Sequence, residues 1–121
     1  MKRALFLVSA LALGLAGNAL AQSGAINAEP NPCRIRPGER ECRTHITWET
    51  QGVARAKVLV KSEGKDEKVH EFSSSAVCRN RDCPAPWIRP DTRYVFKLYD
   101  FSEGRLGREL SQVTVTGERE R

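Results

Sequence analysis

The chain has 121 residues, of which 29% are charged, and its formal net charge is +5. This length fits one ordinary domain. Acidic and basic residues alternate along it, which is typical of a mixed, solvated surface, whereas a nucleic-acid-binding protein would more often show a concentrated basic stripe. The composition therefore favours a single domain and argues against an intracellular nucleic-acid partner.

Residues 1–21 have the form of a secretory signal peptide. Two basic residues precede an apolar stretch from Ala4 to Ala16, and Ala19-Leu20-Ala21 fits a small-residue cleavage site. The alternative, a transmembrane anchor, would need about 20 unbroken apolar residues. We expect cleavage after Ala21, a mature chain of 100 residues with a net charge of +3, no membrane span, and a periplasmic or secreted location.

All four cysteines lie after the expected cleavage site, and an even number in an oxidising compartment predicts two disulfides. Three pairings are possible, and we favour the two local ones because each pair flanks a polar, turn-forming segment. The first bridge would then pin the first strand of the chain to the second. A metal site is the alternative, but the spacings fit no zinc pattern, and we expect neither metal nor cofactor. The expected pairs are Cys33–Cys42 and Cys78–Cys83.

Short segments with period-2 alternation follow one another along the mature chain, separated by turn residues. The fourth of them is rich in charge, which suits the edge of a sheet. Seven such segments without a helical period predict an antiparallel β-sandwich. They span residues 25–28, 42–50, 54–61, 67–72, a short stretch around 84–88, 92–101 and 109–116.

The alternation also predicts which residues fill the core. Trp48 is in phase with Ile46, so we expect its ring between the two sheets; the alternative is an exposed aromatic platform. Ile88 is expected to point inward, which leaves Trp87 either against the outside or over an open end of the sandwich. The two histidines, His45 and His70, fall on faces predicted to point outward.

The stretch from Ile88 to Leu98 has an apolar residue, a proline, a turn and then Tyr94 on an alternating strand. That order is typical of a tyrosine corner, in which the hydroxyl bonds back to the chain just upstream. With Trp48, Ile88 and Tyr94 as core residues, the mature chain resembles the fibronectin type III and immunoglobulin-like modules of exported bacterial proteins. The resemblance implies one all-β, seven-stranded sandwich over residues 22–117. The run of charged residues at 118–121 predicts a disordered tail.

The pattern carries no catalytic constellation, so we expect a binding module rather than an enzyme. Arg79 and Arg81 lie on the loop that the second disulfide would close, and arginine suits bidentate contact with carboxylate or phosphate. The expected partner is a protein or an anionic component of the cell envelope. The alternative for the arginines, which their acidic neighbours favour, is that they serve only solubility. The alternative is a carbohydrate-binding module that uses Trp87 and Tyr99 as stacking rings; a hydrolase is the third possibility. The oligomeric state is left open.

Overall fold

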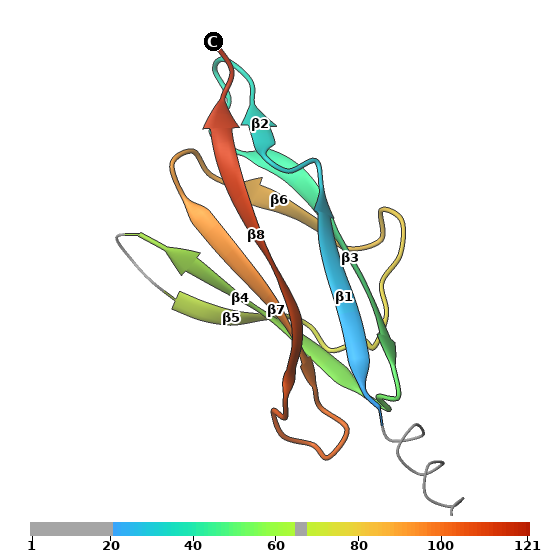
Figure 1. The fold of residues 1–121 in the computed structure, drawn as a ribbon. Helices are drawn as coiled ribbons and strands as arrows, with labels where there is room; N and C mark the ends of the chain where they lie inside the picture. The colour runs from blue at the N-terminus through green and yellow to red at the C-terminus, as the bar shows by residue number, and fades with distance from the viewer. Residues whose placement is uncertain (1–20, 65–67) are drawn as a thin grey trace, which may run out of the picture.

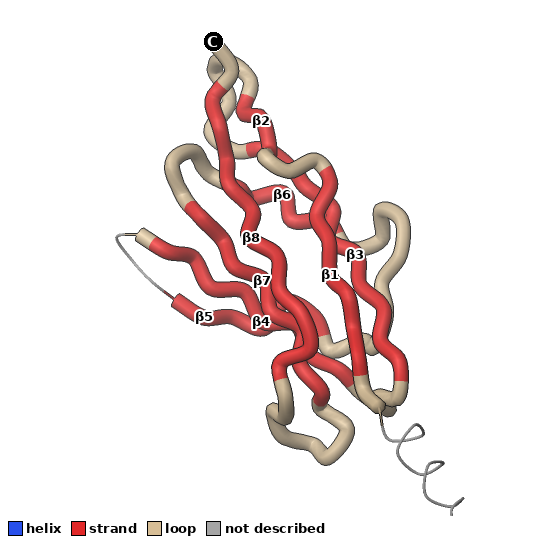
Figure 2. Tube along the Cα trace, in the orientation of Figure 1, coloured by secondary structure: helices blue, strands red, loops and turns tan. Residues whose placement is uncertain are grey.

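A computed structural model describes residues 21–64 and 68–121, so the expected signal peptide, apart from Ala21, lies outside the described residues. Every regular element in the described part is a strand (Figure 2). The all-β prediction is therefore confirmed. The strands are β1 (Ser23–Glu29), β2 (Cys33–Ile35), β3 (Cys42–Gln51), β4 (Ala56–Glu63), β5 (Lys68–Ser73), β6 (Pro84–Ile88), β7 (Arg93–Asp100) and β8 (Glu109–Arg119).

The described strands form two sheets (Figure 1). One has the order β1-β3-β6 and is antiparallel; the other has the order β2-β8-β7-β4-β5 and is mixed, because β2 runs parallel to β8. The expectation of seven antiparallel strands is therefore wrong in one respect: β2 is an eighth strand, and it pairs in parallel. The chain leaves β1 at Glu29, passes through a segment with two prolines, and enters the opposite sheet at Cys33.

The last strand is longer than its sequence pattern predicts. Gly117, Glu118 and Arg119 belong to β8, where they pair with the three residues of β2. The Glu120 amide then donates to the Ile35 carbonyl at 2.9 Å. The expectation of a disordered tail at 118–121 is therefore wrong for its first two residues. Their polar sequence does not indicate a strand, but β2 provides the backbone hydrogen-bonding partners that order them.

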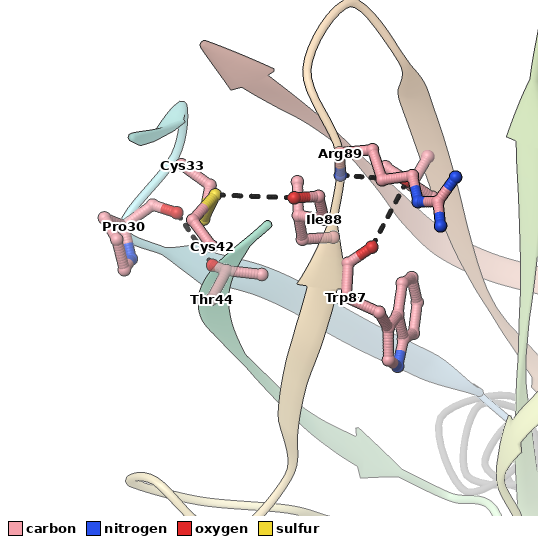
Figure 3. Close-up of a disulfide and its surroundings, with 8 residues drawn as sticks. Pro30, Cys33, Cys42, Thr44, Trp87, Ile88 and Arg89 are labelled. Carbon is pink, nitrogen blue, oxygen red and sulfur yellow. Dashed lines mark hydrogen bonds between the residues drawn. A yellow bond between two sulfur atoms is a disulfide. The ribbon is translucent and has the colours of Figure 1, made fainter. Parts of the chain in front are cut away.

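Cys33 and Cys42 form a disulfide with their Cα atoms 6.1 Å apart, which confirms the predicted pair. The bridge does not pin the first expected strand to the second, because Cys33 belongs to the additional strand β2. Cys33 lies in the five-stranded sheet and Cys42 in the three-stranded sheet, so the bridge ties the two layers together (Figure 3). Beside it, the Thr44 hydroxyl donates to the Pro30 carbonyl at 2.7 Å and holds the crossing segment against β3.

The core lies between the sheets and is built from the inward rows of both. Trp48 is 1% exposed, and its indole N–H donates to the Ser75 carbonyl at 2.9 Å. A buried indole needs such a partner because an unpaired N–H would cost free energy. Phe96 and Ile88 are fully buried beside it. The ring of Trp48 therefore fills the core and does not form an exposed platform.

Tyr94 links the two sheets at the turn between β6 and β7. Its hydroxyl accepts a hydrogen bond from the Arg89 amide at 3.0 Å and donates to the Trp87 carbonyl at 3.4 Å. The ring belongs to the five-stranded sheet, while Trp87 belongs to the three-stranded sheet. This is the contact to the upstream chain that defines a tyrosine corner.

The two sides of the sandwich differ. On one side, β1 packs against β8 and β7 and closes the gap between the sheets. On the other side, the outermost strands are β5 in one sheet and β6 in the other (Figure 1). We call this second side the open side, and it is where the candidate site lies.

Candidate functional site

A cavity of about 550 Å³ opens between the two sheets on the open side, and we call it the open-side groove. Strands β4 and β5 form one wall, β6 forms the other, and β7 contributes the floor. Most of its apolar lining is aromatic. The lining residues are Val60, Ser62, His70, Glu71, Phe72, Trp87 and Tyr94.

The strand register places one row of β5 toward the groove. His70 pairs with Val60, whose side chain is 6% exposed and belongs to the core. Directly opposed residues share a face of the sheet, so His70 points inward, as does Phe72 two positions later. The expectation that His70 faces outward is therefore wrong. His45 does lie on the outward row, but Glu29 and Pro84 flank it on both sides and it is only 9% exposed.

Trp87 is held by other aromatic rings. Its ring stacks on Phe96 with a centroid distance of 6.0 Å and an interplanar angle of 20°. Tyr94 and Phe72 approach it edge-on, at 5.3 and 6.4 Å. Because Phe96 is fully buried, one face of the indole is turned to the core and the rest of the ring borders the groove. The sequence left two positions open for Trp87, and the ring lies over the open side of the sandwich.

The rim of the groove is polar but carries little free charge. The Glu71 carboxylate pairs with the Lys57 ammonium at 2.9 Å on the outer face of the five-stranded sheet, while His70 is exposed on the groove side of β5. An aromatic floor with a rim of hydrogen-bonding groups suits noncovalent recognition of a partly apolar ligand. In residues 21–64 and 68–121, no group of three or more His, Cys, Asp or Glu is placed to hold a metal ion.

The second predicted disulfide, Cys78–Cys83, is also present, with Cα atoms 6.5 Å apart. Both cysteines are fixed on β3: Cys78 exchanges two backbone hydrogen bonds with Trp48 at 2.9 Å each, and the Ile46 amide donates to the Cys83 carbonyl at 3.0 Å. The four residues between them form an excursion from a strand that would otherwise run along β3. We call this excursion, 79–82, the arginine loop.

The arginine loop turns away from the groove. Arg79 lies 3.7 Å from the Glu49 carboxylate, with both side chains largely exposed, and it borders a hollow with Asn27 and Thr47 on the outer side of the three-stranded sheet. An exposed pair of this kind contributes little to stability but partly neutralises Arg79. The structure therefore separates Arg79 and the rest of its loop from Trp87, which faces the space between the sheets.

The two rings proposed for glycan stacking are also separated. Tyr99 pairs with Lys57 on the outer row of the five-stranded sheet, where the Lys57 ammonium lies 4.1 Å from the centre of the Phe101 ring. Trp87 packs on the inner row of the same sheet. One flat platform cannot contain both Tyr99 and Trp87.

The one pKa shift resolved in the described part lies away from the groove, at the end of β7. The Ser102 hydroxyl donates to Asp100 Oδ1 at 2.6 Å, and the Ser102 amide donates to the same oxygen at 3.0 Å. These bonds lower the pKa of Asp100 below its ordinary value of 3.8, with smaller help from Gln22 and Arg108, while desolvation acts in the opposite direction. This carboxylate therefore stabilises a turn and does not line the open-side groove.

Sequence reasoning named Trp87 but missed Phe72 and His70, which complete the groove. The sequence did contain a signal for them. Phe72 ends a charged segment and is expected to bury its ring, and His70, two residues earlier on the strand, must share the face of Phe72.

Over the described residues, the structure has no helix long and apolar enough to cross a membrane. No protein-family model, curated protein or solved structure matches the chain.

Proposed function

We propose that this protein is an exported, non-enzymatic binding module that takes a protein partner at the open-side groove. Two disulfides in a chain of this size support an oxidising compartment, in line with the signal-peptide pattern at 1–21. Strand β1 begins at Ser23, so cleavage after Ala21 would leave every described strand intact. Mass spectrometry of the exported protein tests this point: we expect a chain that starts at Gln22, and an uncleaved chain would contradict export by this route.

The finer assignment of the fold is part of the same proposal. We propose an immunoglobulin-like or fibronectin type III sandwich, and the contact of the Tyr94 hydroxyl with Trp87 and Arg89 supports it. The parallel pairing of β2 with β8 is compatible with a sandwich of this kind but is not what the sequence resemblance predicts. The proposed function does not depend on this assignment, because many functions occur on one fold.

The observation that carries the function is the position of Trp87. A large aromatic side chain at the border of a cavity leaves apolar surface in contact with water, which is unfavourable in the free protein. Covering about 100 Å² of such surface with a partner would contribute roughly 2.5 kcal/mol. Because Phe96, Tyr94 and Phe72 fix the indole, little side-chain entropy is lost on binding.

A glycan is the second candidate ligand, and the stacked geometry of Trp87 favours it over other small molecules. One indole face with His70 at the rim could take a single sugar ring. Tyr99 does not extend this surface, since it lies on the other side of the five-stranded sheet. A protein partner is preferred because the groove is lined mainly by apolar groups and lies between two sheet edges. A glycan array tests this alternative. Glycans that bind the wild-type protein but not Trp87→Ala would favour a glycan over a peptide as the ligand.

A displayed library of random linear heptapeptides tests the proposal without requiring an identified partner. We expect enrichment on the immobilised wild-type protein and loss of the enriched peptides on Trp87→Ala. Tyr99→Ala is the matched control, because it removes an aromatic ring from a different face. Circular dichroism must show that Trp87→Ala is folded; if it is not, His70→Trp fills the groove from an exposed position instead. No enrichment, or equal enrichment on the groove variants, would refute the proposal.

A further inference from the structure

We infer that the partner binds as an extended peptide segment that adds a strand to the free edge of β5 and places an apolar side chain in the open-side groove. This inference rests on the proposed function and specifies its ligand. Two strand edges border the groove, one from β5 and one from β6. Their backbones are not equally available.

The edge of β6 is already closed to a further strand. Pro84 and Pro86 have no N–H to donate, so two of its five residues cannot contribute a donor to a ladder. The Tyr94 hydroxyl occupies the Trp87 carbonyl and the Arg89 amide at the end of the strand. An incoming peptide would therefore find few free partners along β6.

The edge of β5 is open by the same criteria. Its six residues, Lys68–Ser73, include no proline, and β5 is the outermost strand of the five-stranded sheet, paired on one side with β4. Alternate N–H and C=O groups of such a strand point away from its neighbour and can pair with another chain. Four consecutive residues from Lys68 to Glu71 are exposed, so no described part of the chain covers this part of the strand.

The geometry of a sheet links this edge to the groove. A strand added to β5 would lie about 4.8 Å farther out, and its alternate side chains would continue the inward row of His70 and Phe72. That row faces Trp87 across the groove. Backbone hydrogen bonds would then supply affinity, and a cavity of about 550 Å³ would select an aromatic or large aliphatic side chain.

The charge of the edge favours an acidic residue in the peptide. The Glu71 carboxylate is paired with Lys57, whereas Lys68 makes no ion pair within the described part of the chain. An acidic side chain directly across from Lys68 would provide the missing partner. We therefore expect library peptides with β-branched residues, one central aromatic or large aliphatic residue and one Asp or Glu, and with proline depleted. Proline-rich or purely basic peptides would overturn the inference.

Backbone methylation of the most enriched heptapeptide tests strand addition directly. Only one edge of the peptide can pair with β5, so N-methylation of alternate amides should matter for one of the two alternating sets. We expect at least about a tenfold loss of affinity for that set and less than about a twofold change for the other. The amides of β5 that point outward should also exchange their hydrogens more slowly in the complex than in the free protein.

The outcomes separate this inference from the proposed function. If neither methylated set weakens binding while His70→Trp does, the groove binds peptides but strand addition is wrong. If no heptapeptide is enriched at all, the proposed function fails. Sedimentation of the free protein tests whether a second copy of the chain occupies the groove. A dimer that His70→Trp dissociates would mean that the occupant is a second copy and not a peptide, whereas a monomer would support the peptide.

Discussion

Replacing Tyr94 with Phe removes one oxygen atom and tests the contact that joins the two sheets beside the groove. The hydroxyl accepts from the Arg89 amide at 3.0 Å and donates to the Trp87 carbonyl at 3.4 Å, and the residue is only 6% exposed. Each such bond contributes about 0.5–1.5 kcal/mol net, and groups left without a partner in a partly buried site cost more. Since the second bond is long, we expect a loss of about 2 kcal/mol in the free energy of unfolding.

Urea denaturation of the oxidised protein measures this loss. We expect a lower midpoint with an unchanged slope, because the surface exposed on unfolding is the same. For a domain of this size, about 2 kcal/mol corresponds to a fall of roughly 10 °C in the melting temperature. Tyr99→Phe is the matched control, since the Tyr99 hydroxyl makes no hydrogen bond with the described residues.

Equal stability of Tyr94→Phe and Tyr99→Phe to within about 0.5 kcal/mol, the usual scatter for surface substitutions, would contradict this expectation. That result would mean that the hydroxyl of Tyr94 exchanges protein partners for water without cost. It would also remove one of the two arguments that the edge of β6 is closed.

Three further predictions concern the disulfide, the pH dependence and the arginine loop. Joint replacement of Cys33 and Cys42 by Ser should lower the free energy of unfolding by about 2–3 kcal/mol in urea titrations. Because folding lowers the pKa of Asp100, its contribution is present above the ordinary value of 3.8 and lost as pH falls through the folded pKa, so the stability difference from Asp100→Asn should shrink in acid. Joint replacement of Arg79 and Arg81 by Ala should leave the affinity for the selected heptapeptide unchanged within about twofold.

Each of these predictions can fail clearly. An unchanged urea midpoint without the first disulfide would show that the bridge between the sheets adds nothing to stability. A stability difference from Asp100→Asn that is constant from neutral pH to about pH 3 would contradict the role of the Ser102 hydrogen bonds. Loss of peptide binding in the double arginine variant would place the partner on the arginine loop and not in the groove.

The sequence predicts best where pairing is local and alternation is long. Strand β3 shows ten residues of clear alternation around Trp48, and both disulfides close short polar segments. Strand β2 was missed because three residues are too few to show a period. Its parallel partner in β8, from Gly117 to Arg119, also lies far along the chain. The extent of β8 beyond Gly117 was missed for the same reason.

The groove could be predicted only in part. Alternation within β5 indicates that His70 shares the face of Phe72, yet the sequence gives no sign that Trp87 lies across from them. These residues come from edge strands of different sheets that do not pair with each other. Their approach is set by how the two sheets pack, which is a property of the whole domain rather than of any one segment.

The most direct test of the account is the affinity of the most enriched heptapeptide for wild type, His70→Trp and Tyr99→Trp, measured by isothermal titration calorimetry. Both variants introduce an indole at a strand position, but only His70 lines the groove. We predict at least about a tenfold weaker affinity for His70→Trp and an affinity within about twofold of wild type for Tyr99→Trp. Equal affinity of all three proteins would contradict binding at the open side.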